Sequence, residues 1–80
     1  MLDLPVQPVL DEAGRLIAFS TRRNGRTARH RVKRLLGEWP APLGARLYRF
    51  QVVEDSERIL IVEIVGAGLH GGWHLRDVWE

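Results

Sequence analysis

The chain has 80 residues, of which 12 are Lys or Arg and 10 are Asp or Glu, so its formal net charge is +2. Hydrophobic residues make up 45%, which excludes a mostly disordered chain, and the length predicts one domain, residues 1–80, with a thin core. The lack of cysteine excludes disulfides, thiolate metal sites and cysteine nucleophiles. The sequence has neither a signal-peptide pattern at its start nor an apolar run of the roughly 20 residues that span a membrane. We therefore expect a cytoplasmic protein with no membrane partner.

Turn residues divide the first third of the chain. Pro5 and Pro8 lie in a short extended segment that ends in a turn over residues 11–14. Asn24 and Gly25 predict a two-residue type I′ hairpin loop, because both residues tolerate a positive φ. The sequence alternates on either side of this loop, which is typical of two antiparallel strands.

The hairpin loop determines which residues share a face. Counting outward from it pairs Phe19 with His30, and Ile17 is predicted to face the core beside Phe19. The opposite face then carries a row of alternating cations, namely Arg29, Arg31 and Lys33. A slip of one residue would bury these cations, so the register is well specified.

Residues 26–36 also fit a helix. Four apolar residues in this segment have helical spacing: Ala28, Val32, Leu35 and Leu36. The Asn-Gly turn favours a strand over residues 26–32, and a helical turn over residues 33–36 stays open. Residues 37–44, rich in Pro and Gly, predict a loop from which Trp39 folds back onto the core.

A second hairpin is predicted from residues 46–54 and 58–65, which alternate on either side of a three-residue turn. This register pairs Arg49 with Glu63 across the two strands. One face of the hairpin is apolar, and the other is partly so, which implies either a central strand pair or a homodimer interface there. The predicted interface residues are Val53, Ile59, Ile61 and Val65.

A glycine-rich connection over residues 66–72 leads to a last strand over residues 73–79. Short strands with tight turns, and no long helical periodicity, predict an all-β fold. We expect a small antiparallel barrel or a strongly bent sheet of five or six strands, SH3-like in size. Its core is expected to be filled or capped by four aromatic residues: Trp39, Phe50, Trp73 and Trp79.

Positive charge is concentrated in residues 15–34, which hold eight Lys or Arg and no acid. Ordinary surfaces intersperse both signs, and rows of guanidinium groups suit phosphate oxygens, so this block favours binding to a polyanion. A solvated outer face is the alternative. The candidate nucleic-acid-binding residues are Arg15, Arg22, Arg29, Arg31 and Lys33.

Features that can carry catalysis are weak in this sequence. The glycines of residues 66–72 lack the helix and the Lys-Ser/Thr pair of a phosphate-binding loop. His70 and His74 have no third donor for a metal ion, and neither Ser20 nor Ser56 lies in a nucleophile elbow. We therefore expect no enzyme, no catalytic residue, no cofactor and no metal site.

Several short segments together resemble one protein family. They are Pro-Val-Gln-Pro-Val (5–9), Gly-Arg-Leu-Ile-Ala-Phe (14–19), Val-Lys-Arg-Leu-Leu-Gly-Glu-Trp (32–39), Leu-Tyr-Arg-Phe (47–50) and Gly-Trp-His-Leu-Arg-Asp-Val-Trp (72–79). In this order they resemble a family of small bacterial proteins of unknown function, often encoded beside error-prone Y-family DNA polymerases. The chain departs from the family at residues 21–25, where members often have Trp-Arg-Gly. The resemblance implies a link to DNA replication or repair and supplies no catalytic residue.

Two functions follow as hypotheses. The first is a non-enzymatic accessory module that binds DNA or RNA, or a DNA polymerase or repair protein, through the basic hairpin face. The alternative is a homodimerising protein–protein interaction module with no nucleic-acid ligand. The sequence does not choose between duplex DNA, single strands and RNA.

Overall fold

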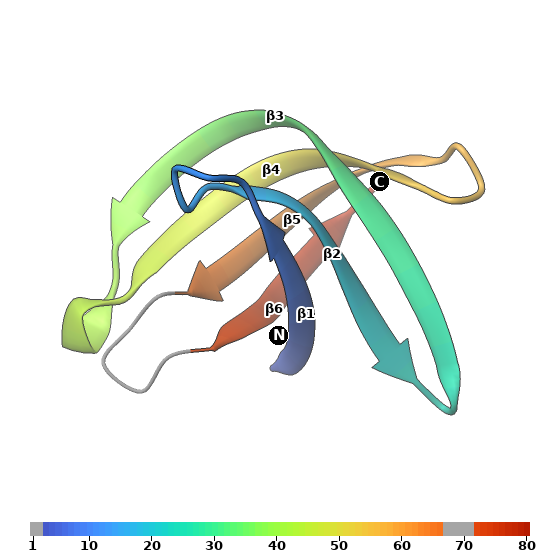
Figure 1. Ribbon diagram of the computed structural model, residues 1–80, viewed down its shortest axis with the longest axis horizontal. Coiled ribbons are helices and arrows are strands. Elements are labelled where there is room, and N and C mark those ends of the chain that lie inside the picture. The colour runs from blue at the N-terminus through green and yellow to red at the C-terminus, as the bar shows by residue number, and fades with distance from the viewer. Residues whose placement is uncertain (1–2, 67–71) are drawn as a thin grey trace.

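Residues 3–66 and 72–80 are described by the structure, a computed structural model, and they form six β-strands and one 3₁₀ turn, Pro42–Gly44. The strands are β1 Leu4–Leu10, β2 Leu16–Arg23, β3 Arg26–Pro40, β4 Arg46–Glu54, β5 Ile59–Gly66 and β6 Trp73–Trp79. Each strand pairs antiparallel with the next, and β1 pairs with β6, so the sheet closes into a barrel (Figure 1). The predicted small all-β antiparallel barrel is confirmed.

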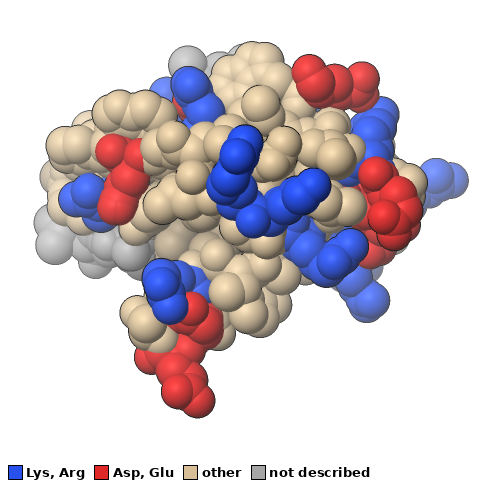
Figure 2. All heavy atoms as spheres, turned by 90° about the horizontal axis from the view of Figure 1, so that it is seen from above, with Lys and Arg blue, Asp and Glu red and all other residues tan. Residues whose placement is uncertain are grey.

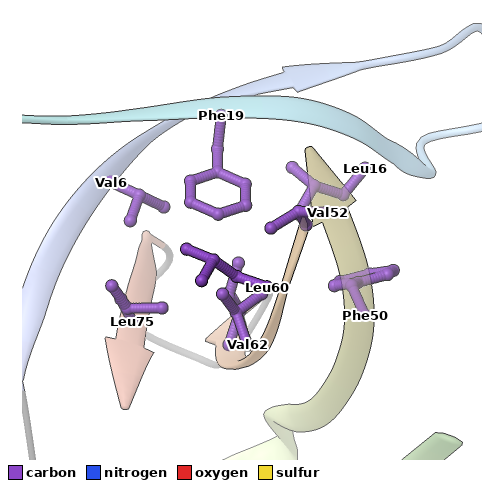
Figure 3. Close-up of a cluster of buried hydrophobic side chains, with 9 residues drawn as sticks. Val6, Leu16, Phe19, Phe50, Val52, Leu60, Val62 and Leu75 are labelled. Carbon is purple, nitrogen blue, oxygen red and sulfur yellow. The ribbon is translucent and has the colours of Figure 1, made fainter. Parts of the chain in front are cut away.

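The core lies inside the barrel and is built from the inward-facing positions of the strands (Figure 3). Its buried members are Val6, Leu16, Phe19, Phe50, Val52, Leu60, Val62, Ile64 and Leu75. Strand β5 shows the underlying pattern most clearly, because its residues alternate between buried and less buried along the whole strand. The apolar area that these side chains remove from water is the main force that holds the sheet closed.

The first hairpin has the predicted register from its turn to the pair of Ala18 and Arg31, but the expected pairs of Ile17 with Val32 and of Leu16 with Lys33 do not form. Asn24 and Gly25 both have positive φ, 52° and 76°, as a type I′ turn requires. Phe19 lies opposite His30, and Ser20 lies opposite Arg29. The tip of this β2–β3 hairpin extends well beyond the body of the barrel (Figure 1).

A β-bulge corrects the predicted orientation of Ile17. Val9 of β1 pairs with Ala18, but the next residue, Leu10, pairs with Leu16, so Ile17 is an extra residue in β2. The bulge turns Leu16 into the core at 6% exposure and leaves Ile17 outside at 46%. The prediction that Ile17 faces inward was therefore wrong, because simple alternation assumes an unbroken ladder.

Strand β3 corrects two further predictions, since it runs without interruption to Pro40. The alternative of a helical turn over residues 33–36 is wrong, and so is a loop that begins at residue 37. Bulges at Lys33 and Leu36 explain the misleading spacing. Each adds a residue to the strand, so the residues that lie opposite inward positions of β4 follow one another at intervals of three, as residues on one face of a helix do.

The strands β2 and β3 separate beyond the pair formed by Ala18 and Arg31. A cavity of about 260 Å³ lies between the start of β2, the bulged part of β3 and the neighbouring aromatic residues. Its lining includes Leu16, Val32, Leu35, Tyr48, Phe50 and Trp73. The Tyr48 ring stacks on the rings of Phe50 and Trp73 with centroid separations of 5.6 Å each. Phe50 and Trp73 thus contribute to the core as predicted.

The second hairpin also has the predicted register, with Arg49 opposite Glu63. Its three-residue turn closes through hydrogen bonds from the Glu57 N–H to the Glu54 carbonyl and from the Glu54 N–H to the Arg58 carbonyl, both 2.9 Å. Glu57 has a φ of 68°, in the left-handed region that disfavours a residue with a Cβ atom. The turn therefore retains local backbone strain at Glu57.

Replacing Glu57 by Gly should raise the free energy of unfolding by roughly 0.5–1 kcal/mol, because Gly adopts a positive φ without steric conflict. Urea unfolding followed by circular dichroism measures the change. Ser56→Gly, one residue earlier and at a negative φ, should not stabilise the protein. The turn geometry would be contradicted if Glu57→Gly unfolded at a urea concentration no higher than that of Ser56→Gly.

Candidate nucleic-acid interface

The basic row lies on the outer face of β3, as the register of the first hairpin predicts. Arg29 is opposite Ser20 of β2, and Arg31 lies between Ala18 of β2 and Val53 of β4. Both arginines are exposed, because the inward positions on either side of Arg31 belong to His30 and Val32. The alternation of the strand therefore separates the charged face from the core.

The bulge at Lys33 changes the end of this row. Lys33 is the extra residue and is exposed, while Arg34 takes the next regular outward position, opposite Gln51. Arg34 therefore joins Arg29 and Arg31 on the outer face. Sequence reasoning missed Arg34, since two-residue spacing from Arg31 leads to Lys33.

Cations of the β2–β3 hairpin differ in their ion pairing from cations on the other described strands. Within residues 3–66 and 72–80, seven of them make no ion pair: Arg22, Arg23, Arg26, Arg29, Arg31, Lys33 and Arg34. By contrast, carboxylates contact Arg46, Arg49 and Arg58 at 3.2 Å, 2.7 Å and 2.9 Å. Figure 2 shows basic side chains in the middle of one face, with the acidic ones toward its margins.

Arg15, also predicted to bind nucleic acid, stands apart from these unpaired cations. Its Nε lies 3.1 Å from Oδ2 of Asp11, so its charge is already compensated. The backbone N–H of Arg15 also donates to the Asp11 carboxylate at 2.9 Å and is the main cause that lowers the pKa of Asp11. Arg22 lies opposite Thr27, close to the tip of the hairpin and among the unpaired cations.

The hairpin tip places like charges directly against each other. Arg23 pairs with Arg26 across the ladder, on either side of the turn at Asn24 and Gly25. Like charges in opposite positions destabilise a strand pair. An anionic ligand at the tip would relieve this repulsion.

His30 lies behind the basic row and faces the core. Its ring stacks on Phe19 with a centroid separation of 4.8 Å and an interplanar angle of 14°. The residue is only 8% exposed, and its Nδ1 atom has no hydrogen-bond partner among the described residues. Burial lowers the pKa of His30 below its ordinary value of 6.5, against an opposing effect of Glu54 and Asp55. At neutral pH the ring is uncharged and belongs to the packing.

Two tryptophans lie outside the barrel, contrary to their predicted place in the core. Trp39 is 41% exposed on β3, and Trp79 is 40% exposed on β6. A bulge in β6 between its contacts with Glu63 and Ile64 reverses the alternation, so that Trp79 lies opposite the outward Ile61. Sequence reasoning missed this aromatic pair, since only the pairing of β6 with β5 reveals the bulge.

Arg49 lies between the two indole rings. Its guanidinium carbon is 5.3 Å from the centroid of Trp39 and 5.4 Å from that of Trp79, within cation–π range. Oε2 of Glu63 accepts hydrogen bonds from Arg49 Nη2 and Nε at 2.7 Å and 3.1 Å. A hollow of about 500 Å³ lies beside this group, lined by Leu36, Trp39, Arg49, Ile61 and Trp79. We call it the tryptophan hollow.

The predicted homodimer residues share the same outer face. Val53 lies opposite Ile59, Ile61 opposite Trp79, and Val65 between strands β4 and β6. Ile59 is 46% exposed, whereas the other three are half-buried. On β4 and β5 the face thus carries these apolar residues around the Arg49–Glu63 ion pair, whereas on β3 it is basic from Arg29 to Arg34.

Other kinds of site find little support in the described residues. Within residues 3–66 and 72–80, no group of three or more His, Asp or Glu side chains is placed to hold a metal ion. His70 and the centre of the glycine-rich connection, residues 67–71, lie outside the described residues. In the described part of the chain, no helix has the length and apolar character needed to cross a membrane.

No protein-family model, curated protein or solved structure matches the chain. The resemblance to small bacterial proteins encoded beside Y-family polymerases therefore stays a prediction.

The lowered pKa of His30 predicts a pH-dependent stability. Below about pH 6.5, His30 takes up a proton more readily in the unfolded chain than in the folded protein. The free energy of unfolding should therefore decrease as the pH is lowered. The variant His30→Phe keeps a ring against Phe19 but has no group to protonate there, so its free energy of unfolding should decrease less as the pH is lowered. Urea unfolding between about pH 7.5 and pH 5 measures it. The same decline in both proteins would contradict this assignment.

Proposed function

We propose that this protein is a non-enzymatic accessory module that binds nucleic acid through the outer face of the β2–β3 hairpin. The observation that carries the proposal is the segregation of cations: the hairpin holds the seven unpaired ones of the described residues, whereas Arg15, Arg46, Arg49 and Arg58 each contact a carboxylate. An unpaired guanidinium on an exposed strand is free to bind phosphate oxygens.

The spacing of the row supports contact with a phosphate backbone. Arg29 and Arg31 are two residues apart on one face, which corresponds to about 6.5–7 Å. This is close to twice the phosphate repeat of one DNA strand, about 3.4 Å. Such contacts position a backbone without reading bases, so we expect weak sequence preference and a strong dependence on salt.

A partner in DNA replication or repair, such as a DNA polymerase, is a further part of the proposal. It rests on the family resemblance of the sequence segments alone. The basic hairpin would then bring the partner to nucleic acid or hold both at once.

Removing charge from the row should weaken binding and its salt dependence together. The double variant Arg29→Gln/Arg31→Gln should reduce the log–log salt slope on duplex DNA by about 2, from a starting value near −3 to −4. Fluorescence anisotropy with a labelled oligonucleotide at several salt concentrations measures the slope.

The matched control is Arg15→Gln/Arg46→Gln, which removes the same net charge from arginines that already pair with acids. Its slope should stay close to that of the unaltered protein. If the salt slope decreased equally in both double variants, binding would depend on net charge alone. Dissociation constants weaker than about 100 μM at low salt, for duplex and single strand alike, would exclude the proposal.

Homodimerisation is the second candidate function, favoured by the apolar residues on the outer face of β4 and β5. Ile59 is the most exposed of its residues, so Ile59→Lys can alter an interface without disturbing the core. If copies associate there, Ile59→Lys should sediment as a monomer and Ser56→Lys, in the neighbouring turn, as the unaltered dimer. An unaltered protein that is monomeric at several hundred micromolar would exclude this function.

A further inference from the structure

We propose that the tryptophan hollow receives a base of single-stranded nucleic acid, whose phosphates follow the basic row on β3. This inference rests on the proposed nucleic-acid function and specifies its ligand. The sequence does not choose between a duplex and a single-stranded ligand. The two exposed indoles favour a single strand.

The hollow has fixed aromatic walls. Trp39 and Trp79 flank Arg49, whose side chain is itself fixed by two hydrogen bonds to Glu63. Gly37 leaves room for the Trp39 ring, since a Cβ atom there would lie 2.4 Å from Trp39 Cη2. Trp39 thus packs over Gly37 and against Arg49, and Trp79 packs against Arg49, while about two-fifths of each tryptophan stays exposed. Rings that are already ordered lose little entropy when a base stacks on them.

The basic row leads directly into this hollow. Arg34 lies opposite Gln51, Gln51 opposite Ile61, and Ile61 opposite Trp79, so one line across the sheet joins the row to one indole. Along β3 itself, the same outer face continues from Arg34 to Trp39. Each path covers about 13–15 Å by ordinary strand dimensions, a length that a few nucleotides can span.

Acidic residues around the hollow do not oppose an anionic ligand strongly, because several are already paired. Glu63 contacts Arg49, Glu38 contacts Arg46 at 3.2 Å, and Glu80 contacts Arg58. The row on β3 has no such compensation within the described residues. The unpaired cations thus lie on β3, from Arg29 to Arg34, where they complement phosphate, whereas the one cation in the lining of the hollow is the paired Arg49.

Aromatic side chains beside a basic track are the usual means by which proteins bind single strands, since every base has a face that can stack. In a duplex, those faces are covered by neighbouring base pairs. A second copy of this chain fits less well, because a symmetric contact through the hollow would bring the unpaired Arg31 and Arg34 of both copies into one interface. Charge therefore favours a single strand over self-association.

The test compares two substitutions of one residue. Trp79→Leu keeps an apolar side chain but loses the ring, whereas Trp79→Phe keeps a ring. We expect Trp79→Leu to weaken binding of an oligothymidine strand roughly 5- to 100-fold, and Trp79→Phe to retain most of the affinity. Binding to a duplex of equal length should change little in either variant. Trp39→Leu and Trp39→Phe, on a different strand, repeat the comparison if a Trp79 variant fails to fold.

Each outcome decides between the alternatives. If the single strand and the duplex respond to Arg29→Gln/Arg31→Gln but not to loss of the indoles, this inference is wrong and the proposed function stands. If neither oligonucleotide binds the unaltered protein, both fail. If Trp79→Leu instead changes the sedimentation coefficient of the free protein, the hollow is a self-contact and the inference is also overturned.

Discussion

The strand β3 constrains the rest of the molecule, because it must pair with β2 along its first half and with β4 along most of its length. A regular strand would stay too straight to do both around so small a core. The bulges at Lys33 and Leu36 supply the bend and keep Val32 and Leu35 directed toward β4's inward residues. They also direct Arg34 and Trp39 outward. Closure of the barrel and the composition of its outer face thus share one cause.

Much of the fold follows from local signals in the sequence. Both hairpin registers are predicted correctly, since Asn24 and Gly25 specify the first loop, and the alternation around Arg49 and Glu63 specifies the second. The bulges are not predictable in this way, because each depends on how a strand fits its neighbour. They account for the errors at Ile17, at the end of β3 and at Trp79.

The candidate site is predictable to a similar degree. The cations on β3 are evident from charge and alternation, but the sequence does not reveal which arginines have acidic partners. Arg15 is four residues from Asp11, and only the turn geometry brings their side chains to 3.1 Å. The tryptophan hollow requires β3, β4 and β6 to lie side by side, which no local pattern indicates.

The two parts of the proposed binding surface are coupled differently to stability. Arg49 pairs with Glu63 between two strands and contacts the indole on either side of it, so it supports the sheet and would also serve the proposed stacking site. A change at Arg49 therefore confounds folding with recognition. Arg29 and Arg31 are exposed and make no ion pair within residues 3–66 and 72–80, so we expect their removal to leave the barrel's core and ladders intact. A thin barrel can tolerate many such uncompensated cations because its closure depends on inward apolar residues, which leaves the outer face of β3 free to serve a ligand.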